Sequence, residues 1–145
     1  MPTNLYESWQ GVASTSKEQL FELVVELLNK KGIVTDEQML LRELYLRETA
    51  GSTLIETGFA VPHIESNFLT QPLLLRIRLV NDISWEQGQM VQTVLFLFIR
   101  KSETKTNLLK IKRLMQALAN EDFVDRIMRA DGLTVDQEIK QLLKG

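Results

Sequence analysis

The run from Val94 to Ile99 constrains the fold more than any other part of the sequence. It reads Val-Leu-Phe-Leu-Phe-Ile, with no polar residue at alternate positions and with many β-branched or aromatic side chains. A strand that is apolar on both faces lies in the middle of a sheet whose two sides are both covered. We therefore expect a central strand here, between two layers that shield it from water.

Segments on either side of this run can supply those layers. Apolar residues at helical spacing predict two helices before it and three after it. These run from about Lys17 to Lys31, from a Thr35-Asp36 cap to about Glu48, from about Asn107 to Leu118, from Phe123 to Met128, and onward from about Thr134.

Other short segments have the composition of strands. They are Leu54-Ile55, Phe59 to Val61 and, more strongly, Leu73 to Val80. In the last of these, Arg76 and Arg78 alternate with apolar residues, which indicates a face that is partly wet. Two helices, several strands and three further helices predict an α/β fold, specifically a three-layer α/β/α single domain over residues 1–145. A central mixed β-sheet is expected between the helical layers.

Composition excludes several classes of protein. The formal net charge of -2 and the lack of a basic run argue against a nucleic-acid binder. No apolar stretch approaches the ~20 residues of a membrane span, and Met1-Pro2-Thr3-Asn4 does not resemble the start of a signal peptide. The absence of cysteine rules out disulfides and thiolate metal sites. The simplest expectation is a soluble, cytoplasmic domain.

His63 is the only histidine of the chain. It follows the expected strand from Phe59 to Val61, and Pro62 cannot continue a sheet ladder, so we expect His63 at the strand exit and within reach of solvent. Because its ordinary pKa lies near neutrality, an imidazole can serve as nucleophile, base or ligand. The alternative is a partly buried histidine with a structural role at the end of a strand.

The polar residues Arg47, Glu48, Ser52 and Thr53 precede this histidine. The planar, permanently charged fork of Arg47 suits phosphate or carboxylate, and the Thr53 hydroxyl can bond an oxyanion. Beside such donors, His63 is better suited to accept a phosphoryl group than to bind a metal. Each residue taken alone also has a structural explanation, since arginines near helix ends satisfy carbonyls and hydroxyls in turns cap the chain.

A metal site is the weaker hypothesis. Glu65, two residues after His63, would complete only a poor ligand set, and there is no second histidine or any cysteine to add to it. We therefore expect no metal, and a metal hydrolase is disfavoured.

Taken together, Arg47-Glu48, Ser52-Thr53, Gly58 and Ala60-Val61-Pro62-His63 resemble a family pattern in both order and spacing. It is that of the type-2 enzyme IIA domain of the phosphoenolpyruvate-dependent sugar phosphotransferase system, the fructose, mannitol and galactitol group. The resemblance continues upstream and downstream, through Ile83-Ser84-Trp85 among other segments. The family fold is a single α/β domain with a mixed sheet between helical layers.

The resemblance implies a phosphoryl relay. His63 would accept phosphate from the phosphocarrier protein HPr and pass it to an enzyme IIB domain, for uptake and phosphorylation of a sugar or sugar alcohol. Arg47 would balance the phosphate charge, while Thr53 and Ser52 would offer hydroxyl or backbone donors. Glu48 would orient Arg47 or serve the structure. Such transfer depends on positioning and charge stabilisation, so no cofactor is expected.

Asn107 marks a departure from the commoner pattern, because fructose- and mannitol-type members usually carry a second histidine at this position. Its amide can still donate to a phosphate or to the His63 ring; otherwise Asn107, or Thr106 before it, caps a helix. Galactitol-type members tend to have an amide there, and His63-Ile64-Glu65 also leans that way, so a galactitol-like subclass is favoured.

Two other functions remain open. One is a regulatory enzyme IIA-like domain whose phosphorylation state signals to a partner. The other is a catalytically dead interaction domain, against which the presence of both Arg47 and His63 argues.

Overall fold

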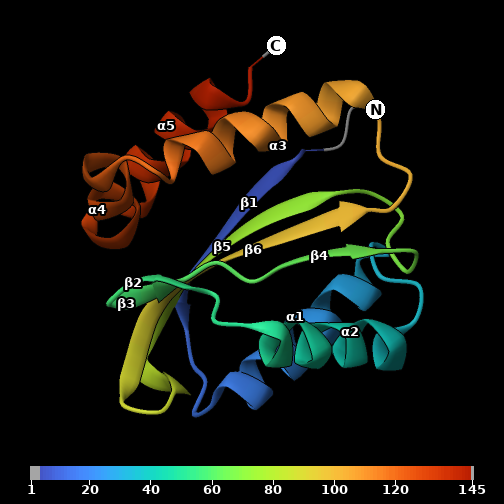
Figure 1. Ribbon diagram of the computed structural model, residues 1–145, viewed down its shortest axis with the longest axis horizontal. Helices are drawn as coiled ribbons and strands as arrows, with labels where there is room; N and C mark the ends of the chain where they lie inside the picture. The colour runs from blue at the N-terminus through green and yellow to red at the C-terminus, as the bar shows by residue number, and fades with distance from the viewer. Residues whose placement is uncertain (1–3, 145) are drawn as a thin grey trace.

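A computed structural model describes residues 4–144, in which one mixed β-sheet lies between two layers of helices (Figure 1). The expected three-layer α/β/α domain is confirmed. The elements, in chain order, are β1 (Tyr6–Val12), α1 (Lys17–Lys30), α2 (Glu37–Ala50), β2 (Leu54–Glu56), β3 (Gly58–Ala60), β4 (His63–Ser66), β5 (Leu73–Glu86), β6 (Gln89–Arg100), α3 (Lys105–Ala117), α4 (Glu121–Arg129) and α5 (Gly132–Leu142). No helix within residues 4–144 is long and apolar enough to cross a membrane.

Strand β6 forms the centre of the sheet, as its apolar run predicts. The strand order is β1-β5-β6-β3-β2, and β4 also pairs with β6. Strand β5 is antiparallel to β6, whereas β3 and β4 are both parallel to it. Strands β3 and β4 pair with successive parts of β6. Strand β3 pairs with Val91 to Val94, and β4 pairs with Leu97 to Arg100.

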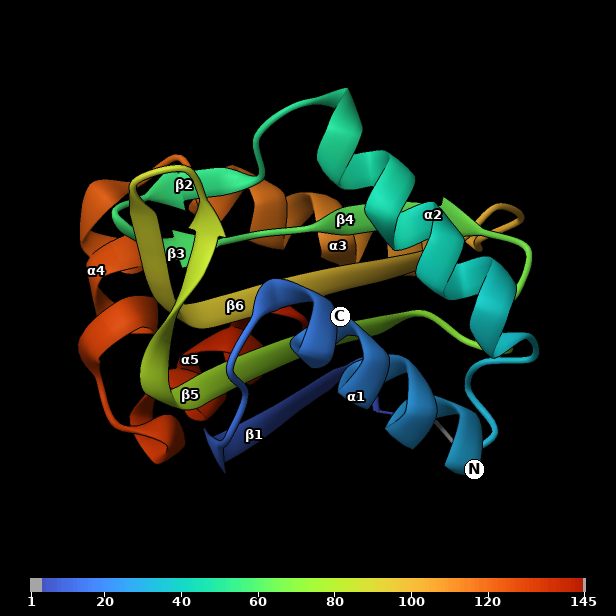
Figure 2. The same cartoon turned by 90° about the horizontal axis from the view of Figure 1, so that it is seen from below.

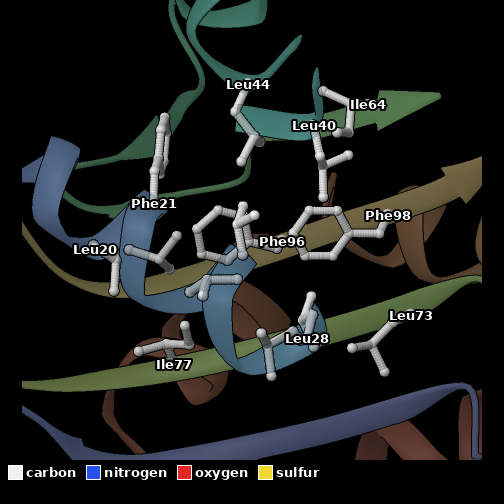
Figure 3. Close-up of a cluster of buried hydrophobic side chains, with 14 of the residues drawn as sticks. Leu20, Phe21, Leu28, Leu40, Leu44, Ile64, Leu73, Ile77, Phe96 and Phe98 are labelled. Carbon is white, nitrogen blue, oxygen red and sulfur yellow. The ribbon is translucent and has the colours of Figure 1, made fainter. Parts of the chain in front are cut away.

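The alternation of side chains along β6 divides its apolar run between two cores. Val94, Phe96 and Phe98 face α1 and α2 and join one buried cluster, which Figure 3 shows together with residues of those helices. Leu95, Leu97 and Ile99 join a second cluster with residues of α3, α4 and α5. Figure 2 shows α1 and α2 on the near face of the sheet. An unbroken apolar strand therefore packs against two helical layers, one on each face of the sheet.

Strand β5 differs from its prediction in length. It continues past Val80 to Glu86, so Asn81 and Asp82 lie within the strand, with a register irregularity between Arg78 and Ile83. A bulge can absorb such polar residues without ending the strand.

The expectation of a partly wet face at Arg76 is wrong. The Arg76 side chain is fully buried, and its Nε and Nη2 atoms donate to the Ile127 carbonyl at 3.1 and 2.7 Å. Helix α4 covers this face and ends over the guanidinium, so the charge is used to satisfy a carbonyl in the last turn of a helix.

Candidate functional site

His63 opens strand β4, at the point where the chain rejoins the sheet. Strand β3 ends at Ala60, so the strand ends before Pro62 as expected, but the expectation that the chain leaves the sheet there is wrong, because β4 begins at His63 and also pairs with β6. The Pro62 carbonyl accepts a hydrogen bond from the Leu97 N–H at 2.9 Å, and His63 then pairs with Leu97 of β6. The imidazole is therefore attached to a backbone fixed on the central strand, and it is only partly exposed.

The electrostatic surroundings of His63 favour a neutral ring. Burial and the positive charge of Arg47 both lower the pKa of His63 below its ordinary value of 6.5. A hydrogen bond with the Val61 backbone and the negative charge of Glu65 act in the opposite direction without reversing the shift. At pH 7 the ring therefore keeps a free lone pair on one nitrogen, which is what a nucleophile requires.

Arg47 comes to this site from the last turn of α2. Its Nη1 atom donates to the Gly51 carbonyl at 3.2 Å, which turns the side chain toward the loop between α2 and β2. Gly51 has a φ of +156°, a backbone conformation that residues with side chains rarely adopt, and a Cβ added there would meet no atom within 4 Å, so the glycine is explained by its backbone conformation. The guanidinium remains partly exposed.

Two neighbouring hollows meet at His63 and Arg47. The larger, of about 740 Å³, lies between α2, β4 and α3 and also includes Lys101 and Lys112. The smaller, of about 320 Å³, lies toward the loop after α2 and includes Ser52 and Thr53. The structure thus brings Arg47, Ser52, Thr53 and His63 together.

The hydroxyl groups of Ser52 and Thr53 already have partners. Thr53 is buried, and its Oγ1 donates to Glu48 Oε2 at 2.9 Å while it accepts from Trp85 Nε1 at 2.9 Å. Ser52 Oγ donates to Glu86 Oε1 at 2.6 Å. A hydroxyl has one proton to donate, so neither is free to donate to a phosphate in this arrangement. Their backbone N–H groups remain the candidates for that role.

Glu48 contacts Lys17 and Thr53. Its Oε1 atom accepts from Lys17 Nζ at 2.9 Å, in addition to the bond from Thr53. These contacts favour the structural alternative for Glu48 over direct orientation of Arg47.

Asn107 lies at the start of α3, and its amide is directed to another partner. Its Nδ2 atom donates to Glu103 Oε2 at 3.1 Å, and Asn107 is not among the residues that line either hollow beside His63. The expectation that Asn107 or Thr106 caps this helix is wrong, since the cap is Thr104, whose Oγ1 accepts from the Asn107 N–H at 3.2 Å. Helix α3 begins at Lys105, two residues before the start at Asn107 that its apolar pattern predicts.

Sequence reasoning missed Trp85 and Lys17. Trp85 donates to Thr53, and Lys17 pairs with Glu48 and lies over the Trp85 ring, 4.8 Å from its centroid. A tryptophan in a strand and a lysine opening a helix carry no local signal of such a contact, because their meeting depends on the pairing of distant segments.

Among residues 4–144 no three histidine, aspartate or glutamate side chains are grouped as metal ligands. What the site offers is therefore a half-buried neutral imidazole, a guanidinium and backbone donors around two open hollows. That combination can hold a phosphoryl group and share its charge.

Comparison with known families agrees with this chemistry. The family described as "Phosphoenolpyruvate-dependent sugar phosphotransferase system, EIIA 2" matches residues 9–144. The chain therefore belongs to the type-2 EIIA family of that system, and it is an EIIA phosphotransferase component.

Two curated relatives show how the domain occurs elsewhere. The fructose-like EIIA component of Escherichia coli is 29% identical over 104 residues, which are 70% of this chain and 70% of that protein. The fructose-specific EIIABC component of Bacillus subtilis is 25% identical over 83% of this chain, but the match spans only 19% of that longer protein.

Two solved structures share the fold. Nitrogen regulatory protein IIA-Ntr from Neisseria meningitidis has a TM-score of 0.70 at 20% identity, covering 97% of each chain. The complex of enzyme IIA-Mtl with phosphorylated enzyme IIB-Mtl from Escherichia coli contains a chain with a TM-score of 0.65 at 19% identity, covering 96% of this chain and 98% of that one.

Proposed function

We propose that His63 accepts a phosphoryl group from the phosphocarrier protein HPr and passes it to an enzyme IIB domain. The observation that carries this proposal is that the chain's only imidazole and Arg47 both line the same two open hollows. Family membership supports the reaction class, and the solved complex of a related IIA with a phosphorylated IIB supports the acceptor.

The chemistry needs little beyond position and charge. The lone pair of a neutral His63 nitrogen attacks phosphorus, a bond from nitrogen to phosphorus forms, and the bond to the donor's leaving group breaks in line with it. Arg47 and the backbone N–H groups after α2 stabilise the negative oxygens during transfer. The same steps in reverse order release the group to the acceptor.

The surface around the site suits a protein donor. Large apolar side chains that are well exposed surround the two hollows, and Lys101 and Lys112 add positive charge. These exposed residues are Leu46, Ile55, Leu108 and Met115. An apolar rim of this kind is typical of a surface that another protein covers during a transient encounter.

The test is phosphorylation of the purified protein by phosphoenolpyruvate, enzyme I and HPr, followed by intact mass. Wild type should gain one acid-labile phosphoryl group, and His63→Gln should gain none while keeping its circular dichroism spectrum and melting temperature. Labelling of His63→Gln at the wild-type level would show that another residue is the acceptor.

For the acceptor sugar system, we infer a galactitol-like subclass. The support is the His63-Ile64-Glu65 order and the amide at position 107, although the Asn107 amide bonds to Glu103. Phosphorylated protein should then transfer faster to a galactitol-type IIB than to fructose- or mannitol-type IIB domains. Equal or reversed rates would contradict this assignment.

A regulatory role is the second candidate, supported by the likeness to a nitrogen regulatory protein. A regulatory domain would be phosphorylated on His63 in the same assay but would transfer to none of the three IIB domains. Failure of His63 to be phosphorylated at all would instead favour an interaction domain without transfer activity.

A further inference from the structure

Thr53 connects the two halves of the candidate site. Its carbonyl accepts from the Val61 N–H at 2.8 Å, two residues before His63. Its hydroxyl donates to Glu48, the residue that follows Arg47. A shift of Thr53 would therefore move both the segment that leads to His63 and the end of α2, which carries Arg47.

Two distant residues fix Thr53 in turn. Trp85, near the end of β5, donates its indole N–H to Thr53 Oγ1 at 2.9 Å. Lys17, the first residue of α1, pairs with Glu48 at 2.9 Å and lies over the Trp85 ring. Four side chains from α1, α2, β5 and the loop before β2 thus form one closed set of contacts.

The set is largely sheltered from water. Thr53 and Trp85 are each 3% exposed, and the Lys17 and Glu48 side chains are 17% and 11% exposed. Sheltered, charge-assisted contacts hold geometry better than surface ion pairs, because water competes less for their partners. The indole N–H would be left without a partner if Thr53 moved, which penalises that movement.

We propose that Trp85 and Lys17 are positioning residues for phosphoryl transfer, which act through Thr53 and Glu48 to hold Arg47 and the Ser52–Thr53 backbone against His63. This inference rests on the proposed roles of His63 and Arg47. Neither Trp85 nor Lys17 lines the hollows beside His63, so neither touches the transferred group.

The chain contains a matched control for each positioning residue. On β1, Trp9 lies beneath Lys31 at 5.6 Å, and Lys31 pairs with Glu7 at 2.6 Å, which is the same trio of side-chain types at the far edge of the sheet. Trp85→Phe is therefore compared with Trp9→Phe, and Lys17→Met with Lys31→Met. The phenylalanine variants keep an aromatic ring and remove the indole N–H.

Two quantities are measured on each folded variant. The first is the rate of phosphoryl transfer from phosphorylated HPr, analysed as kcat and KM. The second is the titration midpoint of the single imidazole, followed by NMR. Trp85→Phe and Lys17→Met should lower kcat by about fivefold with little change in KM. The midpoint should rise, because a displaced Arg47 no longer lowers it. Trp9→Phe and Lys31→Met should leave both quantities at wild-type values.

A drop in melting temperature with unchanged kcat and unchanged midpoint would assign Trp85 and Lys17 a purely structural role and overturn the proposal. So would equal effects in the variants and their controls. Failure of the proposed function would give a different result from failure of the positioning role. Wild type would then accept no phosphate, or His63→Gln would still accept it. The midpoint of the Trp85→Phe imidazole would still report whether the network positions Arg47.

Discussion

His63 carries a pH dependence that its surroundings define. Burial and Arg47 lower its pKa, so the folded protein holds a neutral ring at a pH where an unfolded chain has begun to bind a proton. We expect an NMR midpoint below 6.5 and transfer that persists at pH 6. Arg47→Gln should raise the midpoint by removing the nearby cation. A wild-type midpoint at or above 6.5 would contradict the burial and charge argument.

The same shift has a consequence for stability. Between the folded pKa and 6.5 the unfolded state binds more protons than the folded state, so the free energy of unfolding rises with pH across this window. It should therefore decrease as the pH is lowered from about 6.5, and this decrease should be absent in His63→Gln after other groups are accounted for.

Arg47 contributes both charge and shape. Arg47→Lys keeps a cation but loses the planar fork and the bond to the Gly51 carbonyl, so transfer should slow by several-fold. Arg47→Ala removes the charge as well and should cost about tenfold to a hundredfold. Single-turnover transfer from phosphorylated HPr measures this series, and equal rates for all three proteins would make Arg47 structural.

The residues of the site were easier to predict than their contacts. Each of Arg47, Ser52 and Thr53 has a structural explanation when taken alone, and they stand out with His63 because their combined order and spacing resemble a family pattern. The structure brings the four residues together. That the Thr53 hydroxyl is bonded to Glu48 and Trp85 depends on segments 32 residues apart in the chain. No spacing rule reports such a contact.

At the scale of elements, the start of α3 decides the role of Asn107. Burial raises the pKa of Glu103, but hydrogen bonds from Arg100, Asn107 and the Thr104 N–H outweigh it and hold the pKa at about 2. The Asn107 amide is thus part of a structural cluster. Asn107→Ala should lower the free energy of unfolding by about 1 kcal/mol and leave the rate of phosphoryl transfer unchanged.

Thr106→Ala is the control for this prediction, since Thr106 is an exposed neighbour in the same helical turn. It should change stability by less than about 0.5 kcal/mol. Chemical denaturation and the transfer assay are run on both variants. A slower transfer by Asn107→Ala at unchanged stability would restore the role beside His63.

Elements with strong periodicity were predicted well, and β1 was not predicted. Its sequence, Tyr-Glu-Ser-Trp-Gln-Gly-Val, mixes polar and apolar residues, because an edge strand needs burial on fewer sides than a central one. Strand β4 was not predicted for a different reason. Pro62 precedes it and predicts the end of a strand, although β3 and β4 both pair with β6. Pairing with a distant strand outweighs the local signal in both cases.

At the scale of the whole molecule, the layers follow from the sequence but the strand order does not. The apolar run of β6 requires cover on both faces, and five predicted helices supply it. Which strands flank β6 is decided by contacts between residues far apart in sequence. The order that results sets the start of β4 beside α2 and α3, where His63 and Arg47 can meet.

Arg76 joins the sheet to the helical layer opposite the one that carries Arg47. Fully buried, it satisfies the Ile127 carbonyl near the end of α4, and Arg78 donates to the next carbonyl, that of Met128. Arg76→Ala would leave a cavity and an unsatisfied carbonyl beneath α4.

We therefore expect Arg76→Ala to lower the free energy of unfolding by about 3 kcal/mol. Arg113→Ala is the matched control, because Arg113 also donates to a carbonyl, that of Lys144, but at the surface. It should cost less than about 0.5 kcal/mol. Urea denaturation of both variants measures the difference, and hydrogen exchange should show α4 opening first in Arg76→Ala. Equal stabilities would mean that the buried guanidinium costs as much to desolvate as its hydrogen bonds return.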